Sequence, residues 1–439
     1  MADLSAGLEL EVREAPASYR VMLDSLRVRP GYKQTVVGVI PKDWESIALA
    51  HLSAFITKGS TPTTYGFKWE PSGVLFLRSE CVSEDGLDLA KSMFISPAAH
   101  ATLRRSEVCD GDILVTITGN VGRVVRLVGV GNANLNQHIA RVRITVPNAD
   151  SQYVYHYLSQ PSIRRRFNSI TTGQAYPQIS LKQVREAEVA LPALPEQRAI
   201  AAALSDVDAL IASLDKLIAK KRDIKQGAMQ QLLTGQRRLP GFSGEWEVKR
   251  LGDVAILHKG KGLAKSELNQ FGSEPCIHYG ELFTRYPETI SEILSRTNTN
   301  AGVCRSLAND VLMPTSDVTP NGLATASCVQ QTGVVLGGDI LVIRANSKEL
   351  AGSFLSYVIR QSRNQVMQLV TGTTVFHLYG SDMKKFEFSM PPIEEQRAIV
   401  QILSDMDAEI AALEARRDKT RALKQGMMQE LLTGRIRLV

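Results

Sequence analysis

Two stretches of the chain repeat apolar residues at alternating spacings of three and four, which defines the seam of a coiled coil. The first seam consists of Ile200, Leu204, Val207, Ile211, Leu214 and Ile218. The second consists of Ile399, Leu403, Met406, Ile410 and Leu413. This spacing predicts two long helices that pack against each other. Pro195 suits a first helical turn, and Gly235 and Gly434 suit helix ends. Because the second helix must run back along the first, we expect the pair to be antiparallel.

Both seams belong to an internal repeat. A shift of 199 residues aligns 196–239 with 395–438 without a gap, and 26 of the 44 positions are identical. Weaker matches precede each copy: Trp44 aligns near Trp246, and the dipeptides Lys-Gly and Thr-Gly also recur. The chain therefore contains the same unit twice, and the helices are its best-preserved part.

The segments ahead of the two helices are similar in length but scarcely in sequence. Apolar runs bounded by Gly, Asn or Pro predict strands at 113–117, 139–146 and 340–343. Helical patterns cover 153–170 and 353–370, and each is followed by a Thr-Gly loop and a short strand. We predict an α/β (α+β) fold in which two globular domains are joined by two long antiparallel helices. The expected boundaries are an N-terminal extension at 1–34, a first domain at 35–192, a central helix at 193–240, a second domain at 241–390 and a C-terminal helix at 391–439.

Composition indicates a globular protein, with 44% hydrophobic residues and 22% charged residues. No apolar run is long enough to span a membrane, and Glu9, Glu11 and Glu14 oppose a signal peptide, so we expect a cytoplasmic protein. The five cysteines are far apart and form no C-x-x-C pair, which predicts free thiols. The net charge of +6 is small for 439 residues, so any binding to nucleic acid must come from local clusters.

No pattern in the sequence predicts catalysis. The stretch ending in Lys265-Ser266 lacks the glycine that a phosphate-binding loop places before its lysine. The seven histidines include no i, i+4 pair, and no Gly-x-Ser-x-Gly elbow occurs. We therefore expect a chain that is not an enzyme and that binds neither a metal nor a cofactor.

The doubled motifs resemble those of a known family. Glu-Gln-Arg-Ala-Ile at 196–200 and 395–399 opens each helix, and Lys-Gln-Gly-x-Met-Gln-x-Leu-Leu-Thr-Gly at 225–235 and 424–434 closes it. With a Trp-containing turn ahead of each domain, this pattern resembles the specificity subunit of a type I restriction-modification enzyme. Residues 1–34 have no counterpart before the second domain and depart from the repeat.

The resemblance implies two target-recognition domains that each read one half of a bipartite sequence in double-stranded DNA. It also implies that the paired helices space these domains and dock two adenine methyltransferase (M) subunits. Endonuclease and translocase (R) subunits complete such a complex. S-adenosylmethionine, ATP and Mg are then expected on the partner subunits and not on this chain.

Side chains suited to base or phosphate contacts occur on predicted loops in both domains. In the first domain the candidates are Lys58, Ser60, Thr61, Thr63, Tyr65, Asn120, Arg164, Arg165, Thr172, Gln174 and Tyr176. In the second domain they are Lys259, Lys261, Lys265, Ser266, Thr371, Thr373, Thr374 and His377. Most would contact phosphates or serve as ordinary turn residues, and the sequence does not assign any of them to a base.

A second set of candidates lies on the helices, outside the seam. Lys225, Gln226 and Met229 recur as Lys424, Gln425 and Met428 without an evident role within the chain, so we expect them to face two copies of one partner. A competing interpretation is a coiled-coil scaffold whose domains bind proteins or peptides and never DNA. The weak net charge favours it, and a steep salt dependence of DNA binding would exclude it.

Overall fold

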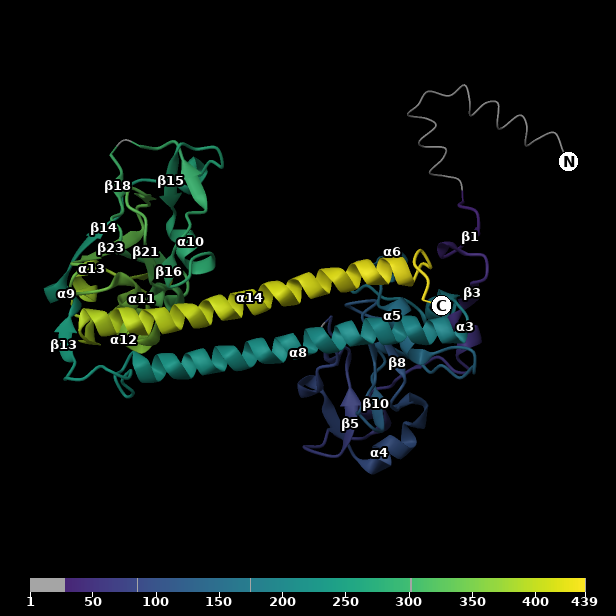
Figure 1. The fold of residues 1–439 in the computed structure, drawn as a ribbon. Coiled ribbons are helices and arrows are strands. Elements are labelled where there is room, and N and C mark those ends of the chain that lie inside the picture. Colours follow the sequence, from purple (N-terminus) through teal and green to yellow (C-terminus); the bar gives the residue numbers. More distant parts are fainter. Residues whose placement is uncertain (1–27, 85, 174, 301, 439) are drawn as a thin grey trace, which may run out of the picture. The chain divides into compact units, whose positions relative to one another are not determined.

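The computed structural model describes residues 28–84, 86–173, 175–300 and 302–438 (Figure 1). The chain divides into two compact units. One unit combines the chain up to Ser213 with the segment from Arg417 onward, and the other comprises Leu214–Arg416. Each unit therefore contains one globular domain and a part of each long helix. Residues 1–27 of the expected N-terminal extension, and Gln174 among the predicted site residues, lie outside the described residues.

The two predicted long helices are α8 (Leu194–Leu232) and α14 (Ile393–Leu431). Each has 39 residues, which corresponds to about 58 Å at 1.5 Å per residue. They pair antiparallel in both units, as expected. In the first unit Lys424 Nζ lies 2.6 Å from Asp208 Oδ1, and in the second Lys225 Nζ lies 2.5 Å from Asp407 Oδ1. The two ion pairs are equivalent under the 199-residue shift.

The seam residues are buried where the helices meet their own domain. Ile200 and Leu204 join the core of the first domain together with Met428 and Leu431 from the end of α14 and with Leu432, which follows it. In the second unit the core contains Ile399 and Leu403 from α14 together with Met229, Leu232 and Leu233. Each domain thus completes its hydrophobic core with residues from both helices.

The first domain is built on two four-stranded sheets. The first sheet has the order β4 (Thr57–Lys58), β11 (Ile139–Val142), β8 (Ile113–Thr116), β9 (Val124–Arg126). The second has the order β6 (Met93–Ile95), β5 (Val74–Leu77), β10 (Ala133–Leu135), β7 (Glu107–Val108). Two smaller pairs are β1 (Tyr32–Thr35) with β2 (Gly38–Pro41), and β3 (Glu45–Ala48) with β12 (Glu188–Leu191). The short helices are α3 (Leu49–Leu52), α4 (Pro97–Thr102), α5 (Ser151–Leu158), α6 (Pro161–Ser169) and α7 (Leu181–Arg185).

The second domain has a five-stranded and a four-stranded sheet. The five-stranded sheet has the order β14 (Ala255–Lys259), β23 (Ile340–Ala345), β19 (Val311–Pro314), β21 (Ser327–Val329), β16 (Thr289–Ile290). The four-stranded sheet has the order β17 (Ser295–Thr297), β15 (Glu274–Ile277), β22 (Val335–Leu336), β18 (Cys304–Arg305). Smaller pairs are β13 (Glu247–Arg250) with β25 (Glu387–Met390), and β20 (Ser316–Asp317) with β24 (Phe376–His377). The short helices are α9 (Leu251–Val254), α10 (Tyr279–Thr284), α11 (Gly352–Gln361), α12 (Arg363–Leu369) and α13 (Gly380–Met383).

The two domains share one topology despite their dissimilar sequences. Strands β4, β11, β8 and β9 correspond in order to β14, β23, β19 and β21. In the other sheet, β5 pairs in parallel with β10 just as β15 pairs in parallel with β22. Both domains therefore present their loops in matching positions, which the sequence did not reveal.

Several predicted elements need correction. The helix expected at 153–170 is two helices, α5 and α6, because Pro161 begins a new helix and its ring does not fit the interior of a longer one. The helix expected at 353–370 is likewise divided into α11 and α12, at Ser362. The strand expected at 139–146 ends at Val142.

Candidate nucleic-acid interface

The motif Glu-Gln-Arg fixes the start of each long helix to its domain. Gln197 donates from Nε2 to the carbonyls of Asn148 and Pro192, and its Oε1 accepts from the amide of Asp150. Gln396 makes the same three contacts in the second domain, to Glu349, Pro391 and Ala351. The amide nitrogen and oxygen of each side chain are both hydrogen-bonded to the backbone, so this glutamine recurs because it holds the helix start to the domain.

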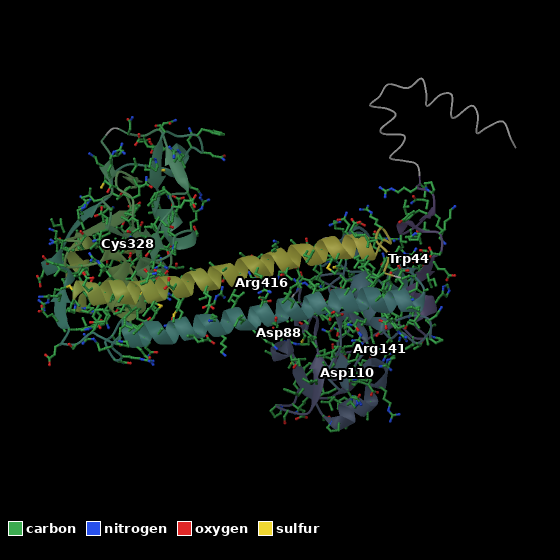
Figure 2. All side chains as sticks on the ribbon, viewed as in Figure 1. Trp44, Asp88, Asp110, Arg141, Cys328 and Arg416 are labelled. Atoms are coloured by element: carbon green, nitrogen blue, oxygen red, sulfur yellow. The ribbon has the colours of Figure 1, made fainter. Side chains whose placement is uncertain are left out.

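The glutamate of the motif joins three segments. Glu196 is fully buried, accepts from Trp44 Nε1 at 3.1 Å, and binds Arg437 with Nε–Oε1 at 2.6 Å. The second unit repeats this arrangement: Glu395 accepts from Trp246 at 3.2 Å and from Arg238 at 2.6 Å. Paired hydrogen bonds between a guanidinium and a buried carboxylate are strong and directional. This cluster explains why the Trp-containing turn recurs ahead of each domain; Figure 2 labels Trp44.

Four loops of the first domain meet at one end and form what we call the first loop cluster: 59–66, 117–122, 136–138 and the described part of 171–178, which is 171–173 and 175–178. Thr61 Oγ1 donates to Gln137 Oε1 at 2.6 Å, which joins the first loop to the third. Gly119 N donates to the carbonyl of Pro177 at 2.8 Å, which joins the second to the fourth. The rings of His138 and Tyr176 lie 6.3 Å apart, edge to face. Predicted site residues from three separate parts of the sequence are therefore neighbours.

The equivalent loops of the second domain form the second loop cluster: 260–264, 315–325, 337–339 and 371–377. Lys259 Nζ lies 3.1 Å from Asp339 Oδ1, next to the first and third loops. Gly338 N donates to the carbonyl of Gly262 at 2.7 Å. Strand β20 pairs with β24, so Ser316 lies opposite His377. The same four connections converge in both domains, with different side chains.

Glycines explain two of the repeated dipeptides. A Cβ at Gly59 would lie 1.6 Å from the carbonyl oxygen of Leu135, and one at Gly260 would lie 2.0 Å from that of Gly337. Gly173 and Gly372 have φ of +85° and +115°, and a Cβ there would also collide with backbone. The Lys-Gly and Thr-Gly pairs therefore recur because the backbone requires glycine, while the residues beside them are free to vary.

The predicted DNA-binding residues are distributed unevenly. Those on or directly beside the loop clusters are Lys58, Ser60, Thr61, Thr63, Tyr65, Asn120, Thr172, Tyr176, Lys259, Lys261, Thr371, Thr373, Thr374 and His377. Lys265 and Ser266 lie in a short 3-10 helix beyond the second cluster, and Lys265 lines a cavity of about 720 Å³ with His278 and Arg296. Arg164 and Arg165 lie on α6 and line a cavity of about 780 Å³ next to Lys424.

Arg164 forms an ion pair at 2.6 Å with Glu84, and this carboxylate is also 4.0 Å from Arg123. The Arg164 guanidinium lowers the pKa of Glu84, so the carboxylate stays ionised at neutral pH. The positive charge of Arg164 is therefore partly neutralised within the domain, unlike that of Lys58 and Lys261, for which the described residues contain no ion pair.

The docking residues were predicted because they have no evident role within the chain, and for four of them that reason is wrong. Lys225 and Lys424 form the ion pairs between the helices, and Met229 and Met428 are buried in the domain cores. These residues recur because each domain needs them. Only Gln226 and Gln425 are exposed. Two exposed apolar residues occupy equivalent positions two residues before them, on another side of each helix: Ile224 is 47% exposed and Leu423 is 59% exposed.

The sequence did not single out Gln137 and His138, which lie in the centre of the first loop cluster. Both belong to the polar turn between β10 and β11, and only knowledge of the strand order identifies that turn as part of the site. The sequence also missed a repeated ion pair in which the carboxylate is buried. Arg143 binds Asp112 at 2.6 Å, and Arg344 binds Asp310 at 2.6 Å, at equivalent positions of the two sheets.

The described residues contain no group of His, Cys, Asp or Glu side chains placed to hold a metal ion. The five cysteines are free thiols. None of the helices in the described ranges combines the length and hydrophobicity needed to cross a membrane. The fold and the loops define a class of protein: a duplicated module in which two domains of dissimilar sequence but the same topology are joined by two long helices of repeated sequence.

Comparisons identify the family of this module. The model of the type I restriction modification DNA specificity domain matches twice, at residues 41–221 and 243–420. The chain belongs to this family, and it is a non-catalytic specificity subunit. The predicted resemblance, the mixed α/β fold with two long packed helices and the predicted non-enzymatic role are confirmed.

Individual relatives agree with the family match. The chain is 24% identical over 429 residues to the putative type I restriction enzyme MjaX specificity subunit of Methanocaldococcus jannaschii, covering 93% of this chain and 97% of that protein. It is 26% identical over 256 residues to the EcoBI specificity subunit of Escherichia coli, covering 56% and 51%. The crystal structure of the S subunit from M. genitalium shares the fold, with a TM-score of 0.58, 14% identity and coverage of 92% and 97%. A chain from a study of assembly of the type I R-M system gives a TM-score of 0.56 at 16% identity, covering 90% and 99%.

Proposed function

We propose that each globular domain reads one half of an interrupted DNA sequence through its loop cluster. The observation that carries the proposal is the convergence of the same four connections in two domains that share a topology but not their side chains. Hydroxyl, amide and cationic groups of this kind recognise base edges and phosphates. The candidate residues on the two clusters supply such groups, and the glycines beside them preserve the backbone while these side chains vary.

We further propose that two M subunits dock on the paired helices and that R subunits join the same complex. In this proposal S-adenosylmethionine, ATP and Mg are bound by those partners, and the complex acts on DNA in the cytoplasm. The docking surface is assigned to Ile224 in one unit and to Leu423 in the other. Gln226 and Gln425 lie two residues further along and therefore on another side of each helix. Large exposed apolar side chains that recur at equivalent helix positions support contact with two copies of one partner.

Methylation mapping of DNA from cells that express the complex tests the reading role. The expected result is one bipartite methylated motif. Exchange of the exposed residues Thr63, Tyr65 and Tyr176 for alanine should change or weaken only one half of that motif. The matched variant in the second domain, with Thr373 and Thr374 replaced by alanine, should affect only the other half. Methylation without a defined motif, or variants that alter both halves equally, would contradict the proposal.

A further inference from the structure

Arg141 carries a buried charge without a counter-ion. It lies on β11 opposite Thr57 of β4, it is only 6% exposed, and Figure 2 labels it within the first domain. One guanidinium nitrogen donates to the carbonyl of Glu107, while Nε has no hydrogen-bond partner among the described residues. Within the same ranges no ion pair includes this arginine.

Neither neighbouring carboxylate forms an ion pair with Arg141 among the described residues. Asp112 accepts from Arg143 through both of its oxygens, at 2.6 and 2.7 Å. Glu107 lies 3.9 Å from His100. Burial lowers the pKa of the Arg141 guanidinium, and the charge of Arg143 adds to this effect. An isolated buried charge destabilises a fold, so its presence points to an anion that binds there.

A second arginine and an aromatic ring lie beside Arg141. Arg105 is exposed, and its Nε donates to Thr57 Oγ1 at 3.1 Å. The guanidinium carbons of Arg105 and Arg141 lie 5.9 and 5.7 Å from the centre of the Phe55 ring. That ring is 47% exposed. The described residues thus place two guanidinium groups, neither in an ion pair, beside one partly open apolar surface.

We propose that Arg105, Arg141 and Phe55 form a binding site for a phosphodiester group of the DNA backbone. The two guanidinium groups bind the phosphate oxygens, and the Phe55 ring packs against the adjacent deoxyribose. Arg141 follows His138 of the first loop cluster by three residues, or about 10 Å along an extended strand. A phosphate held here anchors the strand whose bases the loop cluster reads, so the inference rests on the proposed DNA-reading function.

The second domain lacks this site. Val342 occupies the strand position equivalent to Arg141, opposite His258, and Ile256 occupies the position of Phe55. The conserved topology therefore needs neither arginine nor an aromatic ring at these positions. The contact belongs to the first domain alone and gives the two halves of the target unequal electrostatic anchoring.

The test measures DNA affinity as a function of salt for the full chain co-purified with its M subunits. Probes are a duplex with the mapped target and an unrelated duplex. Each phosphate contact contributes about 0.9 to the slope of log K against log salt. We expect Arg105→Gln and Arg141→Val each to lower that slope by about one, to weaken both duplexes by the same factor, and to leave the methylated motif unchanged.

Arg250→Gln is the control, because it removes an exposed arginine of the second domain that is paired with Glu387 and should leave the slope unchanged. Arg141→Val should fold at least as stably as the parent without DNA, since valine fits the equivalent position. If Arg141→Val fails to fold, the salt dependence measured for Arg105→Gln still tests the inference. An unchanged slope for Arg105→Gln would overturn the inference, and so would stabilisation by inorganic phosphate combined with unchanged DNA slopes. Absence of salt-dependent DNA binding by the parent complex would instead contradict the proposed function itself.

Discussion

At the scale of single residues, equivalent positions of the repeat differ in ways that the two domains tolerate but that change their chemistry. His156 of α5 is buried and lies 2.9 Å from Ser205 Oγ and 3.9 Å from Asp208. In the second domain Tyr357 approaches the equivalent surface of α14 and donates to Asp407 at 2.7 Å. Burial lowers the pKa of His156 to about 3, and the charges of Lys424 and Arg126 contribute. One domain therefore contains a proton-sensitive group where the other contains a hydroxyl.

This difference predicts acid sensitivity of the first unit. The unfolded histidine has a pKa near 6.5 and the folded one a pKa of about 3, so protonation favours the unfolded state. Stability is retained above pH 6.5 and lost as the pH falls toward 3, by about 2 kcal/mol at pH 5. His156→Gln, which remains neutral, should lose less stability than the parent between pH 7.5 and 5.0. Denaturant unfolding of both proteins measures this, with His156→Tyr as a second neutral variant. Equal losses in all three would contradict the assignment.

At the scale of elements, the periodic helices and their doubling were predictable, and the loop clusters were not. A helical seam such as Ile200 and Leu204 depends on neighbours three and four residues away, which the sequence displays directly. The meeting of Thr61 with Gln137 depends on strand order, because β4 and β11 are about 80 residues apart. The prediction that Met229 faces a partner was wrong for a related reason. A helix that packs against both another helix and a domain buries residues outside the coiled-coil seam as well as those within it.

Exposed residues of the helices therefore allow a more specific test of docking than the repeated but buried methionines. Ile224→Asp combined with Leu423→Asp changes two exposed side chains and should abolish co-purification with M subunits while leaving the unfolding transition in place. Met229→Asp with Met428→Asp should instead unfold both cores, since each places a charge in a buried apolar site. Leu217→Asp, at an exposed leucine whose equivalent is Arg416, is the matched control and should retain binding. Retention of two M subunits by the first variant would show that the surface is misassigned.

At the scale of the whole molecule, the continuous helices connect the two units, so we expect their length to set the spacer between the two half-sites. A heptad inserted after Leu214, with another after Leu413, keeps both seams in register and adds about 10 Å, or roughly three base pairs. The bases read should stay the same while the gap in the methylated motif grows by two or three. A heptad in α8 alone should disrupt the pairing and abolish activity. An unchanged gap in an active double insertion would show that the helices do not set the distance.

The division of the two cores has a consequence for synthesis of the chain. The second unit is one continuous segment, so every residue of its core is available once Arg416 has emerged from the ribosome. The first domain is made earlier but must wait for Met428, Leu431 and Leu432 to cover Ile200 and Leu204. During that interval its apolar surface is open, and a chain that stops before α14 ends would leave it open permanently. The domain translated first is thus the last to be finished, and the final turns of α14 determine whether a nascent chain becomes a folded subunit or a target for degradation.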